Sequence, residues 1–306
     1  MMKPNRLYPG DTIGVIAPAG PPNLKNLQRA IPVMEKMGLH VKLGSNIDKV
    51  HGYLAGTDEE RLSDLHDMFA NPAIKAIICA RGGYGTPRIA ADIDYDLIQC
   101  NPKIFWGYSD ITYIHTAIHH AAGLVTFHGP MLASDVGKDT FDDLSLRQFG
   151  QLFQPTTLIY SQLASKLEVI RDGYATGPIV GGNLSLIASG IGTPFEINTK
   201  GRLLLIEDVG EEPYTIDGML NQLKLAGKLA DAAGILVGDF SHAEPTGDKS
   251  SLTLEQVFDH YFSKLSIPVM AGFKIGHCQP HFAIPFGTNA TISTYDKLVK
   301  IDPGVE

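Results

Sequence analysis

The sequence has 306 residues, of which 44% are hydrophobic and 19% charged, and its formal net charge is −8 at pH 7. A chain of this length and composition is typical of a globular protein with room for two domains. The negative charge argues against sequence-independent binding to nucleic acid, which needs a positive surface. The three cysteines are scattered, which argues against a disulfide scaffold or a zinc ribbon. No apolar stretch has the length of a signal peptide or a membrane span, so we expect a cytoplasmic protein with no membrane partner.

In the first half of the chain, short apolar runs alternate with segments whose apolar residues recur at helical spacing. The apolar runs predict strands at 13–17, 40–43, 74–80, 103–108 and 124–127. The periodic segments predict helices at 27–37, 57–69, 86–93 and 113–122. This alternation is typical of an α/β fold with a doubly wound, mostly parallel sheet. The first strand–helix turn lacks the Gly-x-Gly-x-x-Gly fingerprint, which argues against a dinucleotide-dependent oxidoreductase.

The second half of the chain predicts a separate domain. We expect the first domain to cover 1–154, a polar, glycine-bearing linker to cover 155–178, and the second domain to cover 179–306. Its predicted strands are 202–208, 234–240 and 269–273, and its predicted helices are 184–187, 214–225 and 254–265. A last pair of short strands, at 291–295 and 298–301, predicts a hairpin.

A candidate nucleophile follows the predicted strand at 103–108. Gly107 allows the chain to turn sharply there, which would lift the hydroxyl of Ser109 to the carboxyl end of the sheet. The same turn would place the backbone N–H of Asp110 at a helix N-terminus, where it can face an oxyanion. Ser and Asp are also common helix caps, so the pattern by itself leaves both interpretations open.

A glycine-rich turn, Arg-Gly-Gly-Tyr-Gly at 81–85, follows the strand at 74–80. Its N–H groups can cradle an anion, and ligands of open α/β sheets bind beyond the carboxyl ends of such strands. A plain flexible turn is the alternative. Arg81 can pair with a substrate carboxylate or brace the turn. A non-catalytic protein that binds a small anion or a peptide through this turn and the N-terminus at Asp110 therefore remains open.

A serine nucleophile needs a base and a group that orients this base. His115 and His119 have the spacing of metal ligands on a helix, but no glutamate accompanies them, so we expect a packed or surface pair and no metal site. His277 lies in a loop after a predicted strand, where catalytic groups are common. Several carboxylates near the end of the strand at 202–208 can orient a histidine, namely Glu207, Asp208, Glu211 and Glu212.

Six short motifs, in order along nearly the whole chain, make the sequence resemble the serine-peptidase family of L,D-carboxypeptidases. They are Arg-Gly-Gly-Tyr-Gly at 81–85, Gly-Tyr-Ser-Asp-Ile-Thr at 107–112, His-Gly-Pro at 128–130, Gly-Gly-Asn-Leu-Ser at 181–185, Ile-Glu-Asp at 206–208 and Gly-His at 276–277. The resemblance implies a Rossmann-like N-terminal domain, a smaller β-rich C-terminal domain, an active site between them and a homodimer.

The resemblance also implies roles for individual residues. Ser109 would be the nucleophile, His277 the general base and Glu207 the group that orients it. The oxyanion hole would come from the N–H of Asp110 and from a glycine of the turn, Gly82 or Gly83. Three further motif residues are candidates for contacts with the substrate: Arg81, Tyr84 and Asn183. No metal or organic cofactor is implied.

Within this family the sequence looks most like the murein tetrapeptide carboxypeptidases of cell-wall recycling. The implied reaction releases the terminal D-Ala from L-Ala-γ-D-Glu-meso-diaminopimelate-D-Ala through an acyl-enzyme on Ser109. The alternative is the microcin C immunity branch, whose peptidases hydrolyse aminoacyl or peptidyl nucleotide amides. We find no long aromatic-bearing insertion after Gly182 of the kind that this branch uses to bind the adenylate.

Overall fold

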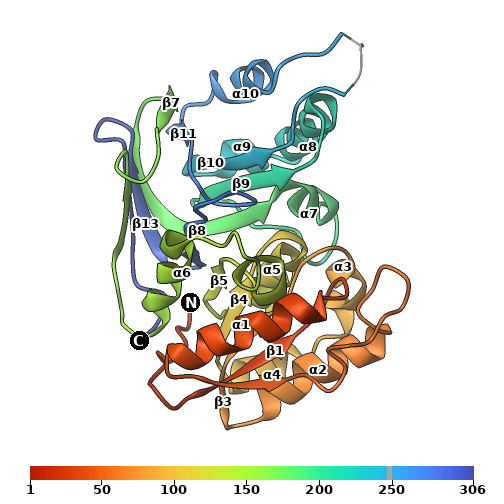
Figure 1. The fold of residues 1–306 in the computed structure, drawn as a ribbon. Coiled ribbons are helices and arrows are strands. Elements are labelled where there is room, and N and C mark those ends of the chain that lie inside the picture. The colour runs from red at the N-terminus through yellow and green to blue at the C-terminus, as the bar shows by residue number, and fades with distance from the viewer. Residues whose placement is uncertain (247–249) are drawn as a thin grey trace. The chain divides into compact units, whose positions relative to one another are not determined.

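The computed structural model describes residues 1–246 and 250–306. The chain forms two compact units, drawn in Figure 1. Unit 1 comprises Met1–Thr156, Phe282–Gly287 and Pro303–Glu306, and unit 2 comprises Thr157–His281 and Thr288–Asp302. The chain therefore passes from one unit to the other at four places. None of the helices in the described residues is both long enough and apolar enough to span a membrane.

Unit 1 contains a six-stranded sheet of order β12-β5-β4-β3-β1-β2. Its strands are β1 (Thr12–Ile16), β2 (His40–Leu43), β3 (Ile74–Cys79), β4 (Ile104–Gly107), β5 (Thr126–His128) and β12 (Ile284–Phe286). The first five strands run parallel, and β12 pairs antiparallel with β5 at the edge. This sheet confirms the prediction of a doubly wound, mostly parallel fold.

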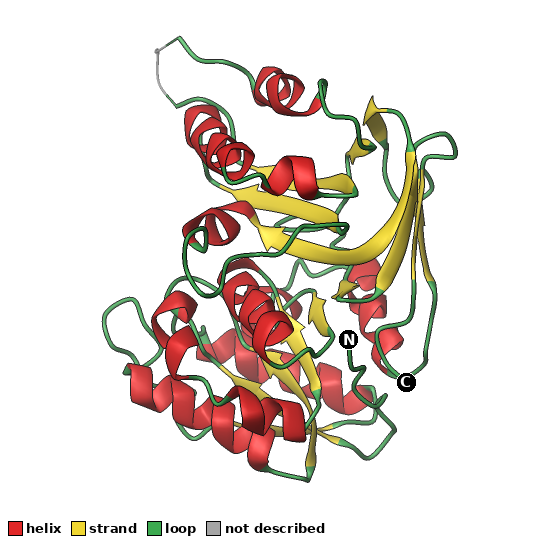
Figure 2. Cartoon of the chain, turned by 180° about the vertical axis from the view of Figure 1, so that it is seen from behind, coloured by secondary structure: helices red, strands yellow, loops and turns green. Residues whose placement is uncertain are grey.

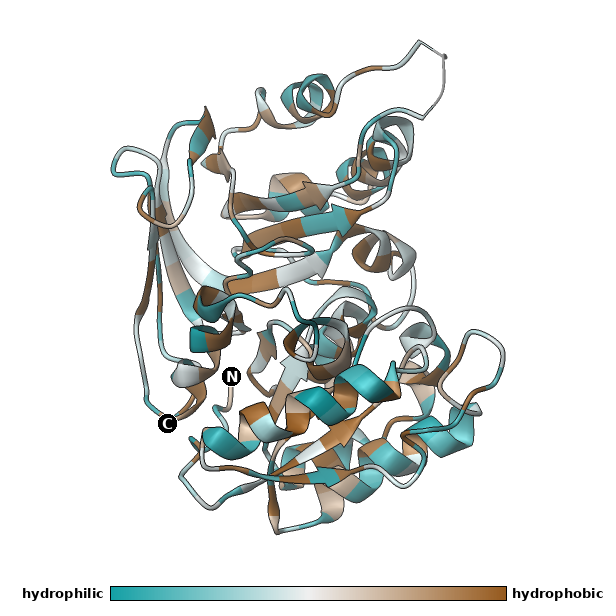
Figure 3. Ribbon diagram, viewed as in Figure 1, coloured by the Kyte–Doolittle hydropathy of each residue, from teal (hydrophilic) through white to brown (hydrophobic). Residues whose placement is uncertain are grey.

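Helices cover both faces of this sheet because successive strand residues point to opposite sides. Ala76 and Ile78 of β3 enter one core, and Ile77 and Cys79 enter the other. The first core includes α1 (Leu24–Lys36), the π-helical turn η3 (Leu132–Val136) and η4 (Gln148–Leu152), with α6 (Asp143–Arg147) beside η4. The second includes α2 (Asp58–Ala70), α3 (Thr86–Ile89), α4 (Tyr95–Cys100), α5 (Thr112–Ala121) and the short turn η2 (Ser109–Ile111). Another short turn, η1 (Ala90–Asp92), follows α3 directly. Figure 3 shows the strands as largely apolar and α1 as striped with polar residues.

Unit 2 contains an eight-stranded sheet of order β6-β14-β13-β8-β9-β10-β11-β7. Its strands are β6 (Leu158–Ser161), β7 (Glu168–Arg171), β8 (Tyr174–Asn183), β9 (Leu203–Val209), β10 (Gly234–Ser241), β11 (Val269–Ala271), β13 (Asn289–Ser293) and β14 (Leu298–Ile301). Strands β8 to β11 are parallel to one another, and the other pairs are antiparallel. The long strand β8 pairs with β13 through its first half and with β9 through its second half, and it curves visibly in Figure 2.

The helices of unit 2 pack on its parallel strands around one core. They are α7 (Leu184–Ser189), α8 (Pro213–Leu225), α9 (Lys228–Asp231) and α10 (Leu254–Phe262). Leu204 and Ile206 of β9 contribute to this core together with Leu220 of α8. Strands β13 and β14 form an antiparallel pair, which confirms the predicted hairpin.

The structure differs from the expected domain boundaries at two places. The segment interpreted as a linker, 155–178, contains β6, β7 and the first half of β8. The strands β6 and β7 lie at the two edges of the sheet and are only partly buried, so they carry no apolar run that sequence reasoning could detect. In addition, Phe282–Gly287 and Pro303–Glu306 belong to unit 1. The sequence predicts both segments in the second domain, because they lie within 179–306 and come after its alternating strands and helices.

Candidate functional site

Ser109 lies at the turn that connects β4 to α5, and its backbone φ is +65°. Within the described residues, only two other non-glycine residues have a positive φ, His242 and Lys297. The N-cap residues of η2 and α5 are Tyr108 and Ile111, and an N-cap residue normally has an extended backbone. The left-handed backbone of Ser109 therefore distinguishes it from an ordinary cap. A strained serine at a sharp turn from a strand into a helix has the geometry of a nucleophile elbow.

The glycine-rich turn lies directly against Ser109. A Cβ atom built on Gly82 would lie 2.9 Å from Cβ of Ser109 and 3.0 Å from its Oγ, so a side chain at Gly82 would displace the serine. Gly83 has a φ of +115°, which side-chain-bearing residues rarely adopt. The structure thus brings together the two turns from which the sequence predicted oxyanion donors.

The side chain of Asp110 joins these two turns. Its Oδ2 accepts a hydrogen bond of 2.9 Å from the N–H of Thr86, and the hydroxyl of Thr86 donates to the carbonyl oxygen of Asp110 at 2.6 Å. The Asp110 side chain is buried, and this burial raises its pKa, while hydrogen bonds from Thr86 act in the opposite direction. Asp110 therefore caps α3 rather than its own helix.

Arg81 and Tyr84, the two candidates for substrate contact in the glycine-rich turn, have different surroundings. Arg81 donates from Nη1 to the carbonyl oxygen of Pro21 at 3.1 Å, so it braces the turn against the loop after β1. Tyr84 is half exposed, and its ring meets that of Tyr53 edge-on with 5.4 Å between the ring centroids. Tyr84 thus presents an aromatic surface to solvent near the glycine-rich turn.

His115 is a site residue whose role the sequence did not predict. Its Nε2 lies 2.9 Å from the carbonyl oxygen of Gly107, two residues before Ser109, and its ring meets that of Phe105 edge-on. Burial lowers the pKa of His115 to about 4, so near neutral pH the ring is uncharged and its Nε2–H donates to Gly107.

His119 instead contacts the hydroxyl of Thr126. The two histidines have different partners, as expected for a packed pair. In the described part of the chain, no group of three or more His, Cys, Asp or Glu side chains is placed to hold a metal ion.

We expect His115 to make the protein less stable in mild acid. The unfolded histidine titrates near pH 6.5, whereas the folded one titrates near pH 4, so the unfolded state binds more protons between these values. The stability that His115 contributes is complete above about pH 6.5 and falls by about 3 kcal/mol as the pH drops through 4. Urea denaturation of the wild type and of His115→Gln at pH 7, 5.5 and 4.5 measures this contribution, because the difference cancels the titration of other groups. Equal pH slopes for the two proteins would contradict it.

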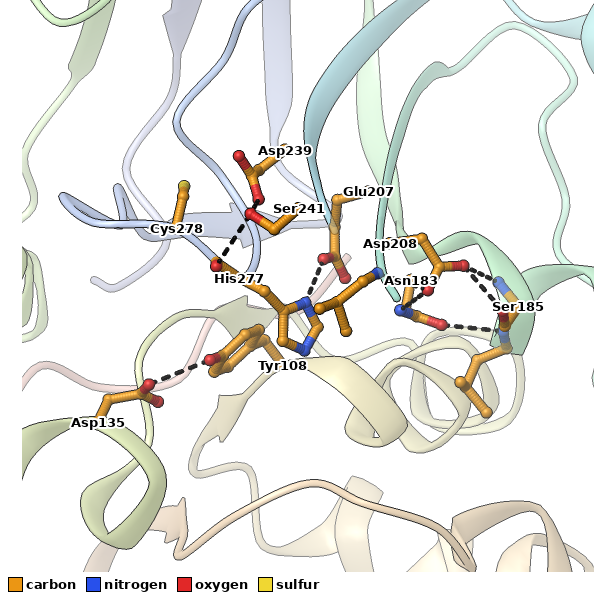
Figure 4. A network of polar contacts seen from close by, with 12 residues as sticks. Tyr108, Asp135, Asn183, Ser185, Glu207, Asp208, Asp239, Ser241, His277 and Cys278 are labelled. Carbon is orange, nitrogen blue, oxygen red and sulfur yellow. Dashed lines mark hydrogen bonds and ion pairs between the residues drawn. The ribbon is translucent and has the colours of Figure 1, made fainter. Parts of the chain in front are cut away.

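In unit 2, Glu207 and His277 form a pair. Oε2 of Glu207 lies 2.8 Å from Nδ1 of His277, as Figure 4 shows. Glu207 is fully buried near the end of β9, and the His277 side chain is 18% exposed. Gly276 has a φ of +130°, and a Cβ atom there would lie 2.7 Å from Oε2 of Glu207. A glycine at this position therefore lets the carboxylate approach the histidine.

Two of the neighbouring acids that competed with Glu207, Asp208 and Glu212, have other partners. Asp208 follows Glu207 on β9, so its side chain points to the other face of the strand. It accepts hydrogen bonds from Nδ2 of Asn183 at 2.9 Å and from the hydroxyl of Ser185 at 2.8 Å (Figure 4). Oδ1 of Asn183 accepts the N–H of Leu186, so this candidate for substrate contact caps α7 and is buried. Glu212 accepts a hydrogen bond from the hydroxyl of Thr246.

The electrostatics of Glu207 suit an orienting role. Burial raises the pKa of Glu207, and the contact with His277 opposes this shift. Among the described residues, Oε1 of Glu207 is buried with no hydrogen-bond partner. The contact with His277 at Oε2 favours the ionised carboxylate, whereas burial favours the neutral form.

The predicted catalytic residues are divided between the two units. Ser109, Asp110 and the glycine-rich turn belong to unit 1, and Glu207 and His277 belong to unit 2. Each unit therefore brings together its own part of the predicted site, a strained serine in one and a histidine–glutamate pair in the other.

Comparison with known proteins gives two family matches. The LD-carboxypeptidase N-terminal domain matches residues 13–129, and the LD-carboxypeptidase C-terminal domain matches residues 176–292. A probable murein peptide carboxypeptidase of Bacillus subtilis (strain 168) is 55% identical over 303 residues, which cover 99% of this chain and 95% of that protein.

Solved structures also resemble nearly the whole chain. The crystal structure of muramoyltetrapeptide carboxypeptidase from Oxalobacter formigenes has a TM-score of 0.85 and 32% identity, and the match covers 95% of this chain and 98% of that one. The MccF-like protein from Bacillus anthracis (strain Ames) has a TM-score of 0.87 and 28% identity, and the match covers 99% of each chain.

Proposed function

The chain belongs to the LD-carboxypeptidase family and is a serine carboxypeptidase, and on that premise we propose that it releases the terminal D-Ala of murein tetrapeptide in the cytoplasm during cell-wall recycling. The observation that carries the choice of substrate is the 55% identity, over 99% of the chain, with a protein named a probable murein peptide carboxypeptidase. Because this family consists of carboxypeptidases, the alternative of a non-catalytic protein that binds a small anion or a peptide no longer applies.

The proposed mechanism is acyl transfer by a triad of Ser109, His277 and Glu207. Ser109 attacks the carbonyl carbon of the residue before D-Ala, and Nε2 of His277 takes the proton of its hydroxyl. Glu207 accepts the Nδ1–H of His277, which keeps Nε2 free to act as the base, and this step is supported by the 2.8 Å contact. The imidazolium then protonates the leaving D-Ala, and water hydrolyses the acyl-enzyme by the same route in reverse.

The negative charge on the tetrahedral intermediate needs N–H donors. We assign these to Asp110 and to Gly82 or Gly83, and the closeness of Gly82 to Ser109 supports the assignment. Each such donor lowers the barrier by roughly 3 kcal/mol in well-studied hydrolases. The mechanism uses no metal and no organic cofactor.

Of the three candidates for substrate contact, Tyr84 fits this role best. Tyr84 is 52% exposed at the glycine-rich turn, whereas Arg81 and Asn183 hold backbone and side-chain partners within their own units. We therefore propose that Tyr84 contacts the stem peptide and that Arg81 and Asn183 support the loops around it.

We also propose that the protein forms a homodimer. Light scattering on the purified protein would measure its molar mass and so test this proposal.

A second candidate function is the hydrolysis of aminoacyl or peptidyl nucleotide amides, as in microcin C immunity. The observation that favours it is the match to the MccF-like protein of Bacillus anthracis over 99% of both chains. Its 28% identity is about half that of the murein peptide carboxypeptidase match, so the murein substrate takes precedence.

Mass spectrometry of the products tests this proposal. The wild type is incubated, with EDTA present, with murein tetrapeptide ending in D-Ala, with the same peptide ending in L-Ala, and with aspartyl sulfamoyl adenosine. We expect release of D-Ala from the first substrate alone, and none by Ser109→Ala. Hydrolysis of the nucleotide substrate alone would favour the second function. Release that EDTA prevents would contradict the proposed serine mechanism.

A further inference from the structure

Two turns that are far apart in the sequence supply the proposed oxyanion donors. The N–H of Asp110 follows β4, and the N–H groups of Gly82 and Gly83 follow β3. Donors stabilise an oxyanion only when each lies about 2.7–3.1 Å from the same oxygen position. The spacing between the two turns must therefore be fixed to within a few tenths of an ångström.

The Asp110–Thr86 pair connects these turns through two hydrogen bonds, both of which Thr86 donates. Thr86 donates its N–H to the carboxylate of Asp110 and its hydroxyl to the carbonyl oxygen of Asp110, at 2.9 and 2.6 Å. Thr86 is fully buried and follows Gly85, the last residue of the glycine-rich turn. The pair thus attaches the end of this turn to the residue after Ser109.

A buried cation also holds the glycine-rich turn at Gly85. Arg61 of α2 donates from Nη1 to the carbonyl oxygens of Gly85 and Pro18, at 2.9 and 2.6 Å, and its Nη2 contacts Asp58. The N–H of Gly20 also donates to the carbonyl oxygen of Gly82 at 3.1 Å. The turn is therefore also anchored to α2 and to the loop after β1.

The direction of the Asp110 carboxylate matters for the developing charge. A free carboxylate beside the nucleophile would repel an oxyanion, but this one faces the N–H groups at the start of α3, and Arg61 attracts it. The N–H of Thr86 and the charge of Arg61 thus offset the negative charge of this carboxylate. The backbone N–H of Asp110 stays the proposed donor to the oxyanion.

We infer that the side chain of Asp110 is a positioning residue, which sets the distance between the oxyanion donor of its own backbone and the donors of Gly82 and Gly83. The inference rests on the proposed function, since the oxyanion hole is part of it. A purely structural role as the cap of α3 predicts instead that its loss lowers stability and leaves turnover unchanged.

The experiment compares Asp110→Ala and Asp110→Asn with a matched cap variant, Asp94→Ala. Asp94 caps α4 in the same unit through a 2.8 Å bond from the N–H of Leu97, and it is exposed. For each protein we would measure kcat and KM for D-Ala release, the melting temperature, and the rate at which a fluorophosphonate labels Ser109. The labelling rate depends on the oxyanion hole and needs no murein substrate.

For Asp110→Ala we expect kcat and the labelling rate to fall by about 100-fold, with KM within about threefold of wild type. Asp110→Asn keeps an acceptor for the Thr86 N–H, so both rates should return to within about tenfold of wild type. Asp94→Ala should lower the melting temperature and leave both rates unchanged. If Asp110→Ala keeps wild-type rates, the inference is overturned. Should Asp110→Ala fail to fold, an Asp110→Asn protein with a 100-fold lower labelling rate overturns it too.

The two readouts separate this inference from the proposed function. A wild type that labels at Ser109 but releases no D-Ala refutes the murein substrate, and the labelling rates of the variants still decide the role of Asp110. A wild type that neither labels nor hydrolyses refutes both.

Discussion

Replacing Ser109 with glycine is expected to abolish D-Ala release and, at the same time, to make the protein more stable. The serine holds a φ of +65°, which costs an L-residue roughly 1–2 kcal/mol relative to glycine. The greater freedom of glycine in the unfolded chain offsets part of this gain, so we expect a rise in melting temperature of about 1–2 °C. Loss of the nucleophile should lower kcat by about 10⁶-fold. Calorimetry and product analysis on one preparation measure both effects.

Two further variants serve as controls for this result. Ser109→Ala removes the hydroxyl but keeps the left-handed backbone, so it should lose activity without the gain in stability. Lys297→Gly relieves a φ of +46° in the turn between β13 and β14, so it should gain stability without loss of activity. A Ser109→Gly protein that melts below wild type would show that the turn stores no strain, and one that releases D-Ala would refute Ser109 as the nucleophile.

Glu207→Gln is expected to lower kcat by about 10³- to 10⁴-fold while the fold stays intact. The carboxylate accepts the Nδ1–H of His277, and a glutamine of the same shape can instead present its N–H₂ group to Nδ1. The proton of the ring would then move to Nε2, and the base would be lost, as in other serine hydrolases whose orienting acid becomes an amide. Steady-state kinetics measure the loss of kcat, and circular dichroism checks the fold.

Asp208→Asn is the matched control for this prediction. Asp208 is the next residue on β9 and is equally buried among polar partners, but its carboxylate faces Asn183 and Ser185. We expect this variant to be less stable and to keep kcat within about threefold of wild type. If the two variants lose activity equally, Glu207 has no special role in orienting His277.

Strands β1, β3 and β4 of unit 1 could be predicted because they are nearly continuous apolar runs bounded by helical segments, whereas the short edge strand β12 was missed. The edge strands β6 and β7 could not, because they are half exposed and find their partners far away in the sequence. Ile159 pairs with Lys300, and Val169 pairs with Met270, so no local signal identifies either strand.

The site shows the same division between local and distant information. Gly107 and Ser109 predicted a sharp turn from local chemistry, and the positive φ of Ser109 confirms that turn. The choice of Glu207 over Asp208 came from the family resemblance. The two acids are adjacent and both buried near the end of β9, and the sequence alone does not show which of them faces a histidine. The contact of His115 with Gly107 was missed, since it depends on how α5 folds back on β4.

The four passages of the chain between the units have a consequence for synthesis on the ribosome. When residue 156 has been made, β5 still lacks its neighbour β12, which is encoded about 130 residues later, and Arg6 still lacks its backbone partner Glu306. The N-terminal unit therefore cannot complete its fold until nearly the whole chain has emerged. A fragment that ends at residue 156 would leave the edge of β5 unpaired, and such an edge is a template for aggregation.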